Sequence, residues 1–180
     1  KFSLVLLIPL YIFILAIFST TFALLAKITS LYIALPIFFL FYVKYKKRVF
    51  FRWNVWLLSI IVSIAVIFWY NRSNIRMTSY IFNPENLHYI INPAFYKRIF
   101  ESIAFFVLTP LGLVLLPFGF LKKAENKMLY FFHIWLISVI LYVLLYSKHN
   151  YVHYSYQIAL VPPGSVFIGR ALAIINEKKL

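Results

Sequence analysis

Several long apolar stretches, each close to the length of one bilayer crossing, constrain the fold of this chain more than any other feature. A membrane-spanning helix needs about 20 mostly apolar residues. Stretches of this kind cover residues 55–70, 103–121, 128–146 and 156–175. The N-terminal part, residues 2–43, is about twice as long as one crossing and is interrupted only by Lys27 and a few hydroxyl side chains.

These stretches predict an all-α, polytopic bundle of about six transmembrane helices. We expect the N-terminal part to supply two spans, residues 2–26 and 28–43, joined by a tight turn near residues 27–30; residues 19–21 are the alternative position of that turn. Composition agrees, because 64% of the 180 residues are hydrophobic and the mean hydropathy is +0.89. A soluble domain could not bury so much apolar surface. The chain has no cysteine, which excludes disulfides and thiolate metal sites.

The two ends of the chain indicate a piece of a longer protein. It begins at Lys1 without a methionine, ends on the charged residues "NEKKL", and shows no cleavable signal peptide. We therefore expect residues 1–180 to form part of a single transmembrane domain.

Basic residues predict which side of the membrane each loop occupies. The chain has 18 Lys and Arg against four acidic residues, for a formal net charge of +14. In the predicted threading, residues 44–52, 122–127 and 177–180 fall on one side with most of the basic residues, and that side should be cytoplasmic. The opposite side carries Lys27, Arg72, Arg76, Lys97, Arg98 and Lys148. We expect no nucleic acid partner, because the charges are split among separate loops.

The longest polar segment, residues 71–101, is predicted to lie on the extracytoplasmic side and to fold onto the surface there. Asn92 fits an N-cap, and Pro93 fits the first position of a helix that runs into the next span. Asn83 and Pro84 indicate an earlier turn. The basic residues of this outer loop are Arg72 and Arg76 at its start and Lys97 and Arg98 at its end.

These outward cations allow two interpretations. Each can be an ordinary surface charge or a contact with lipid headgroups. Together they can also clamp a phosphate, since the arginine fork binds phosphate oxygens bidentately. A phosphate held at the outer membrane surface would most naturally belong to a lipid carrier such as a polyprenyl phosphate. The outer carboxylates, Glu85 and Glu101, can orient an arginine, act as a catalytic base or simply lie at the surface.

A second concentration of polar side chains, "HNYVHYSYQIALVPP" (residues 149–163), lies at the predicted outer end of the last span. His149 and His153 are spaced i, i+4, but no third ligand is near, so we predict no metal site and find no support for a divalent metal. Tyr151 and Tyr154 also fit tyrosines of the membrane interface, whose rings lie in the apolar region and whose hydroxyls face water.

From His153 onward this stretch has the pattern H-x-x-Y-Q-x-x-L-V-P-P. It resembles the last recognisable motif of membrane glycosyltransferases of the GT-C class. The closest branch is family 39, that of the protein O-mannosyltransferases and the bacterial aminoarabinose transferase. Ser155 and Ala159 depart from that motif. Two further segments, "FALLAKITSLYIALPIFFLFYVKYKKR" and "NPAFYKRIFESIAFFVLTPLGLVLLPFGFLKK", are similar to other parts of the family and follow the same order along the chain.

The resemblance implies a GT-C type membrane domain, of which this chain is the C-terminal part. Such enzymes transfer a sugar from a polyprenyl-phosphate donor to a lipid, glycan or protein acceptor. The active face would be the extracytoplasmic side of the plasma (inner) membrane. The catalytic aspartate of the family lies in the first outer loop, and this chain contains no aspartate. The catalytic residue would therefore lie outside this chain, which alone should be inactive.

Residues from both polar segments are expected to bind the phosphate and sugar of the donor. The resemblance favours Lys148, His149, His153, Tyr156 and Gln157. Positive charge favours Arg72, Arg76, Lys97 and Arg98 of the outer loop, and also Lys27. No cofactor is expected besides the lipid-linked sugar donor.

Other functions stay open. An O-antigen ligase or polymerase also uses outer arginines against a polyprenyl diphosphate, but it lacks the H-x-x-Y-Q-x-x-L-V-P-P ending. A membrane transporter has broken helices and polar outer clusters, but would be expected to place ionisable residues near the middle of its spans, where this chain has few besides His133. We expect His133 to make a helix–helix hydrogen bond rather than to bind a ligand. A purely structural membrane subunit is a further alternative.

Overall fold

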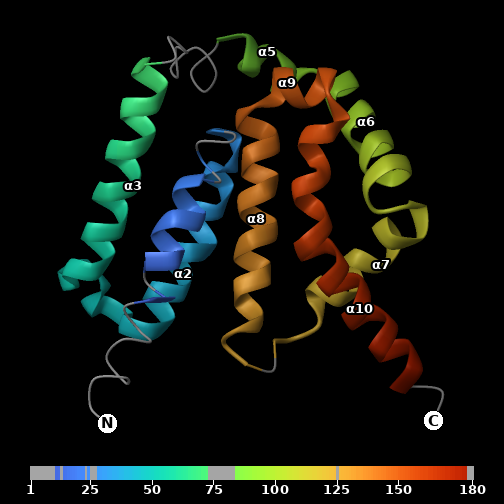
Figure 1. Cartoon of the computed structure of the whole chain (residues 1–180). Helices are drawn as coiled ribbons and strands as arrows, with labels where there is room; N and C mark the ends of the chain where they lie inside the picture. The colour runs from blue at the N-terminus through green and yellow to red at the C-terminus, as the bar shows by residue number, and fades with distance from the viewer. Residues whose placement is uncertain are drawn as a thin grey trace. The chain divides into compact units, whose positions relative to one another are not determined.

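The structure is a computed structural model that describes residues 11–12, 14–22, 24, 28–72, 84–124 and 126–177. Every regular element within these ranges is a helix, which confirms the predicted all-α class (Figure 1). The chain divides into two compact units. The N-terminal unit comprises Lys1–Leu31 and Phe41–Met77, and the C-terminal unit comprises Tyr32–Leu40 and Thr78–Leu180.

The described residues form α-helices, 3₁₀-helices and one π-helix. The α-helices are α2 (Ala34–Tyr45), α3 (Trp53–Arg72), α5 (Pro84–Ile91), α6 (Pro93–Ser102), α7 (Pro110–Leu121), α8 (Leu129–Leu145), α9 (Ser147–Val152) and α10 (Val161–Glu177). Three segments are 3₁₀-helices, namely η1 (Ile28–Ile33), η2 (Lys46–Phe51) and η4 (Tyr154–Leu160). The segment η3 (Ile103–Val107) is a π-helix. Residues 11–12, 14–22 and 24 are also helical.

Helix α3 dominates the N-terminal unit. It covers the predicted span 55–70 and extends it by two residues at each end. Leu58, Val62, Val66 and Tyr70 are buried at intervals of four residues, so they share one helix face. Tyr70 donates a hydrogen bond from its hydroxyl to the carbonyl of Leu24 (3.2 Å), which holds α3 to the N-terminal helical segment. Large apolar side chains remain exposed on other parts of α3, including Ile60, Ile64, Ile67, Phe68 and Trp69.

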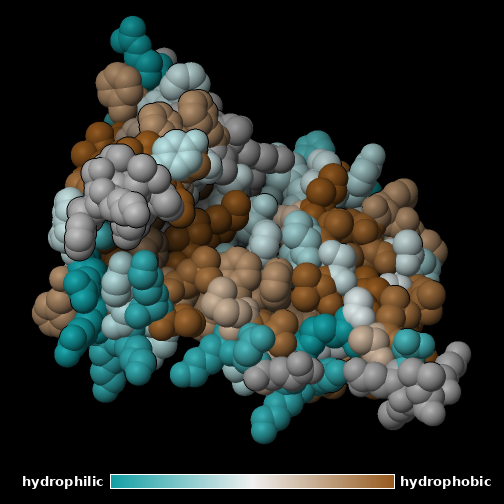
Figure 2. All heavy atoms as spheres, turned by 60° about the horizontal axis from the view of Figure 1, so that its bottom comes forward, coloured by the Kyte–Doolittle hydropathy of each residue, from teal (hydrophilic) through white to brown (hydrophobic). Residues whose placement is uncertain are grey.

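By length and composition, two helices of the described chain can cross a membrane. They are α3 and the run Tyr154–Asn176, which η4 and α10 form together. The number rises to three if the bent pair α6–η3 and α7 counts as one span, while α8 is apolar but shorter. The predicted number of six is therefore not confirmed. Apolar side chains cover much of the face seen in Figure 2, and hydrophilic ones gather toward its lower edge, as expected for a membrane protein.

The predicted span 103–121 is wrong as a single straight helix. Helical structure begins ten residues earlier, at Pro93, and the two halves Pro93–Val107 and Pro110–Leu121 meet at an angle of 101°. Thr109 has a positive φ of 64° and cannot continue a right-handed helix. Its side chain instead accepts a hydrogen bond from the backbone N–H of Gly112 (3.2 Å), while Pro110 occupies the first turn of α7. The residues at the break thus also provide the N-cap and the first turn of α7.

Helices α7 and α10 of the C-terminal unit pack with almost no space between them. A Cβ atom added at Gly119 would lie 1.8 Å from the carbonyl oxygen of Phe167, and one added at Gly164 would lie 2.9 Å from Leu108 Cδ2. Small residues let two helix backbones approach in this way, which is a common means of association in membranes. Pro162 and Pro163 lie in the first turn of α10, where proline is tolerated, so they do not interrupt the run from η4 into α10.

The apolar core of the C-terminal unit forms around α8. Leu136, Val139, Tyr142 and Val143 of α8 are buried together with Phe95 of α6 and Leu160 and Phe167 of the last helical run. Ser138 donates a hydrogen bond to the carbonyl of Tyr32, whose ring packs 5.5 Å from that of Tyr142. Helix α8 therefore connects most elements of this unit.

His133 of α8 makes the helix–helix contact predicted from the sequence. Its Nε2 lies 3.1 Å from the carbonyl oxygen of Phe120 in α7, and its Nδ1 lies 3.0 Å from the carbonyl oxygen of Leu129 one turn earlier in α8. The ring also packs against Phe120 and Phe167. His133 thus belongs to the packing of α7, α8 and α10.

Candidate functional site

The C-terminal unit has two chemically different ends. Helices α5 and α9 lie together at one end, and the loop between α7 and α8 lies at the other (Figure 1). We call them the α5–α9 end and the α7–α8 loop end. Most of the predicted site residues that the structure describes belong to the α5–α9 end.

A cavity of about 260 Å³ opens at the α5–α9 end. Its lining residues come from α6 and η3 on one side and from α9 and η4 on the other: Arg98, Glu101, Ser102, Phe106, Asn150, Tyr151 and Tyr154. The two predicted polar concentrations, the outer loop and the closing stretch, therefore meet at one place. The cavity is slightly smaller than most pockets for drug-sized ligands, so it suits a small ligand group.

The local sequence explains why α6 presents its polar residues to this cavity. The Asn92 side chain accepts a hydrogen bond from Ala94 N (2.9 Å), which confirms the predicted N-cap and fixes the start of the helix. From that start, Arg98, Glu101 and Ser102 follow at i, i+3 and i+4 and so share one face. Ser102 also follows the buried core residues Phe95 and Ile99 at i+7 and i+3, so the polar face of α6 borders its core-facing side.

The π-helix after α6 supplies the apolar part of the cavity wall. Phe106 of η3 stacks on Tyr154 of η4 with ring centroids 5.2 Å apart and planes inclined by 25°. Both rings are exposed to a large extent, 70% for Phe106 and 58% for Tyr154. π-Helical turns occur often at functional sites. This aromatic pair can pack against the apolar side of a bound group.

Arg98 is positioned by the closing stretch. Its Nε donates a long hydrogen bond to the carbonyl of Tyr151 (3.4 Å), and its guanidinium carbon lies 5.8 Å from the centre of the Tyr151 ring. The terminal nitrogens of Arg98 bond to none of the residues that the structure describes. Glu101, one turn further on, likewise forms no ion pair or hydrogen bond within the described residues. The guanidinium of Arg98 and the carboxylate of Glu101 therefore line the same cavity, and both can still form hydrogen bonds to a ligand.

Two buried polar side chains complete the cavity. Ser102 and Asn150 are 8% and 1% exposed, and neither Ser102 Oγ nor Asn150 Oδ1 has a hydrogen-bond partner among the described residues. The other groups of Asn150 are occupied, because its Nδ2 donates to the carbonyl of Tyr146 (3.1 Å) and its own carbonyl accepts from Gln157 Nε2 (3.2 Å). Buried polar atoms normally have partners, so such orphans point to a missing ligand or water.

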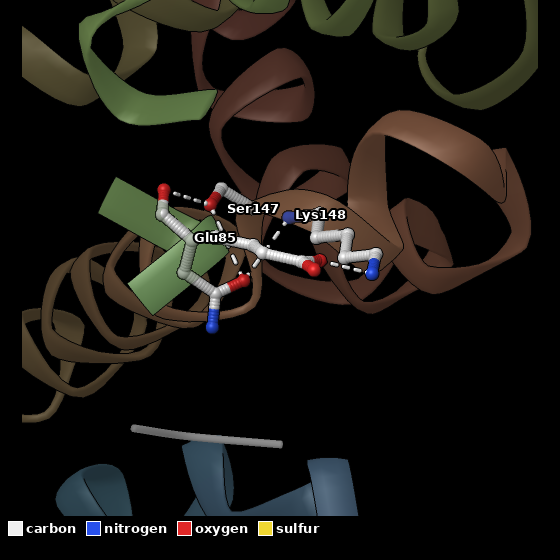
Figure 3. A network of polar contacts seen from close by, with 4 residues as sticks. Glu85, Ser147 and Lys148 are labelled. Carbon is white, nitrogen blue, oxygen red and sulfur yellow. Dashed lines mark hydrogen bonds and ion pairs between the residues drawn. The ribbon is translucent and has the colours of Figure 1, made fainter. Parts of the chain in front are cut away.

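Gln157 and Lys148 occupy places other than the predicted ligand contacts. Gln157 is fully buried and braces the backbone of Asn150. Lys148 pairs with Glu85, and the two side chains point toward one another in Figure 3. The hydrogen bond to Glu85 raises the pKa of Lys148 above its ordinary value. Both residues help to hold the cavity wall in place and do not line the cavity.

Asn86 strengthens the same junction between α5 and α9. Its side-chain Oδ1 accepts a hydrogen bond from Lys148 N (3.2 Å), and its carbonyl accepts one from Ser147 Oγ (2.7 Å). Asn86 and Ser147 are both buried. This junction, also drawn in Figure 3, fixes the start of α9 and with it Asn150 and Tyr151.

The histidines of the closing motif surround Tyr156. Ring centroids lie 6.2 Å apart for His149 and Tyr156 and 5.8 Å apart for His153 and Tyr156. Burial, followed by the positive charges of Lys148 and His153, lowers the pKa of His149. These three residues lie next to the cavity in sequence but do not line it. Within the described ranges, no three His, Asp or Glu side chains come together.

Of the remaining predicted site residues, the structure describes two, and neither is among the cavity-lining residues. Lys97 is exposed on α6 and is not a lining residue. Arg72 ends α3 and belongs to the N-terminal unit. Lys27 and Arg76 lie outside the described residues.

Sequence reasoning did not select Ser102 or Asn150, and it offered Tyr151 and Tyr154 only as interface residues. A signal for Ser102 was available, since it follows Arg98 by four residues on a capped helix. Asn150 had no comparable signal, because its neighbours in the closing stretch are equally polar.

Compared with known proteins, the chain matches no family model, no curated protein and no solved structure. The resemblance to membrane glycosyltransferases therefore stays a prediction from the motif residues quoted above.

Proposed function

We propose that this chain forms part of a membrane glycosyltransferase that takes a sugar from a polyprenyl-phosphate donor at the extracytoplasmic face. The observation that carries the proposal is the cavity in which Arg98 of the outer loop meets the closing stretch. The sequence resemblance supports the same reaction. The acceptor, a lipid, glycan or protein, is left open.

Arg98 suits the phosphate of such a donor. When the bond between the sugar C1 and the phosphate oxygen breaks, its electron pair remains on the phosphate, and the acceptor oxygen forms the new bond to C1. The acceptor proton passes to a base, which the resemblance places outside this chain. A guanidinium that faces the phosphate oxygen stabilises the growing negative charge more in the transition state than in the bound donor. Tyr151 holds Arg98 in position for that task.

The test uses the complete gene product in membranes supplied with radiolabelled polyprenyl-phosphate sugars. Arg98→Ala should lower sugar release by about 100-fold, because a charge-assisted contact to the leaving group is lost. Lys97→Ala, one residue away and outside the cavity lining, should have a much smaller effect. His153→Ala examines the motif itself. Sugar release that neither Arg98→Ala nor His153→Ala disturbs would remove the cavity from the donor site, and no release from any donor would reject the function.

A transporter is the second candidate, and one observation favours it. The helix pair α6–η3 and α7 is broken at 101°, and discontinuous helices form the substrate sites of many transporters. The two functions differ in outcome: a transporter would move an intact substrate across sealed vesicles, whereas a transferase would cleave the lipid-linked sugar. Assaying both processes in the same vesicles decides between them.

A further inference from the structure

We infer that Glu101 is a specificity-determining residue that binds hydroxyl groups of the donor sugar while Arg98 binds the phosphate. This inference rests on the proposed function and adds a role for a residue that the resemblance does not assign. It follows from the position of Glu101, from the lack of a pairing cation among the described residues and from the buried polar atoms beside it.

Glu101 and Arg98 would normally be expected to pair. Side chains three residues apart on a helix are neighbours, and opposite charges at that spacing attract one another. Here Arg98 instead turns to the carbonyl and ring of Tyr151, and no ion pair joins it to Glu101. Both side chains line the same cavity. A ligand with an anionic end and a hydrogen-bond-donating end can therefore engage both.

The second carboxylate of the α5–α9 end has a different task. Glu85 forms an ion pair with Lys148 and belongs to the junction that holds α5 to α9. It does not line the cavity. Of the two outer carboxylates named from the sequence, only Glu101 is thus positioned to contact a ligand there.

The buried polar atoms indicate which kind of ligand group would bind beside Glu101. Asn150 Oδ1 needs a hydrogen-bond donor, and the Ser102 hydroxyl can donate as well as accept. Sugar hydroxyls supply both functions, whereas an ammonium group can only donate. A hydroxyl-bearing ring beside Glu101 would also satisfy atoms that the fold leaves without partners. Phe106 and Tyr154 provide an apolar wall for the same ring.

Binding measurements on two lipids separate the sugar from the phosphate. The complete gene product in nanodiscs is titrated with bare polyprenyl phosphate and with the polyprenyl-phosphate sugar that the wild type binds most tightly. Glu101→Ala should weaken binding of the glycosylated lipid by about tenfold or more and leave binding of the bare lipid unchanged. Arg98→Ala should weaken binding of both lipids. Glu101→Gln, which keeps the shape and one acceptor, should fall between Glu101→Ala and the wild type.

A deoxy-sugar series locates the contact on the ring. For the analogue that lacks the hydroxyl bound by Glu101, the wild type and Glu101→Ala should bind equally. Lys97→Gln serves as a matched control, since it removes a charge from the same helix outside the cavity lining and should preserve the preference for the glycosylated lipid. Thermal unfolding of each variant checks that the fold is retained, and Glu101→Gln keeps the test valid if Glu101→Ala does not fold.

The possible failures are distinguishable. If Glu101→Ala and Glu101→Gln bind both lipids as the wild type does, or weaken both equally, Glu101 does not contact the sugar and the inference is wrong while the proposed function stands. If the wild type binds neither lipid better than it binds a phospholipid, the proposed function is wrong and the inference falls with it.

Discussion

Two arginines at opposite ends of the C-terminal unit have similar partners and different surroundings. Arg98 donates to the carbonyl of Tyr151 and lies 5.8 Å from its ring, and Arg170 of α10 donates to carbonyls and lies 5.9 Å from the ring of Phe167. Arg170, however, makes two bonds from Nη2, to Lys122 (2.8 Å) and Lys123 (3.2 Å). Arg98 makes a single long one and faces a cavity.

The difference separates a residue that serves the fold from one that can serve a ligand. The last carbonyls of a helix lack intrahelical partners, and at the end of α7 they are taken up by neighbouring helices, by Arg170 and His133. The other terminal nitrogen of Arg170, Nη1, is buried and does not belong to the cavity lining. At the α5–α9 end, the junction of α5 and α9 is hydrogen-bonded, and two buried polar atoms that have no partner among the described residues, Ser102 Oγ and Asn150 Oδ1, belong to cavity-lining residues.

The largest expected effect is a loss of stability at the contact between α7 and α10, and it tests whether these two helices pack as closely as the structure shows. Gly119→Ala places a methyl group 1.8 Å from the carbonyl oxygen of Phe167, so α7 and α10 must separate. We expect a loss of about 3 kcal/mol in the free energy of unfolding. Gly169→Ala is the matched control in the partner helix, because nothing lies within 4 Å of its new Cβ and alanine favours a helix by about 1 kcal/mol. Unfolding in mixed micelles measures both, and equal values for the two variants would contradict the packing.

The next effect compares the two arginines directly. Arg170→Ala leaves the carbonyls of Lys122 and Lys123 without their donor and should cost about 2 kcal/mol of unfolding free energy. Arg98→Ala should change the same quantity by about 0.5 kcal/mol or less, since Arg98 is exposed and makes one weak bond. If Arg98→Ala destabilised the protein more than Arg170→Ala, the assignment of Arg170 to the fold and of Arg98 to a ligand would be wrong.

The smallest effect concerns protonation at the α5–α9 end. Burial and neighbouring positive charge lower the pKa of His149, so the folded chain favours the neutral ring and the unfolded chain binds the proton first as the pH falls. The stability is fully present above about pH 6.5, the ordinary pKa of histidine, and declines as the pH falls toward the lowered value. Thermal unfolding between pH 8 and pH 5 should show this decline, and His149→Gln should reduce it. An unchanged pH profile in that variant would assign the decline to another group.

Local signals predicted local structure well. The apolar run of α3, the N-cap at Asn92 and the helix–helix contact of His133 all follow from a few neighbouring residues, and the structure confirms them. The break at Thr109 was missed, although Pro110 is visible in the sequence. The break adjoins a tertiary contact that the local sequence does not specify, since buried Leu108 lies beside Gly164 of α10, far away in the chain.

The candidate site was predicted only in outline. The meeting of the outer loop with the closing stretch was anticipated, but the residues that line the cavity differ from those of the motif. The reason is the 3₁₀ geometry of η4, which turns Gln157 into the interior and Tyr154 toward the cavity. Which of several adjacent polar side chains faces inward depends on that winding, and no sequence pattern specified it.

The uninterrupted helical run from Tyr154 to Asn176 connects the α5–α9 end of the C-terminal unit with its α7–α8 loop end. Tyr154 forms part of the cavity wall. Arg170 lies in the same helical run, about 25 Å away at the rise of a helix, and donates a hydrogen bond to the carbonyl at the end of α7. Because α7 and α10 pack without space at Gly119, we expect a tilt of this helical run produced by a group bound in the cavity to reach that contact. A spectroscopic probe attached at the exposed Leu172, two residues after Arg170, would then detect binding in the cavity without contacting the cavity itself.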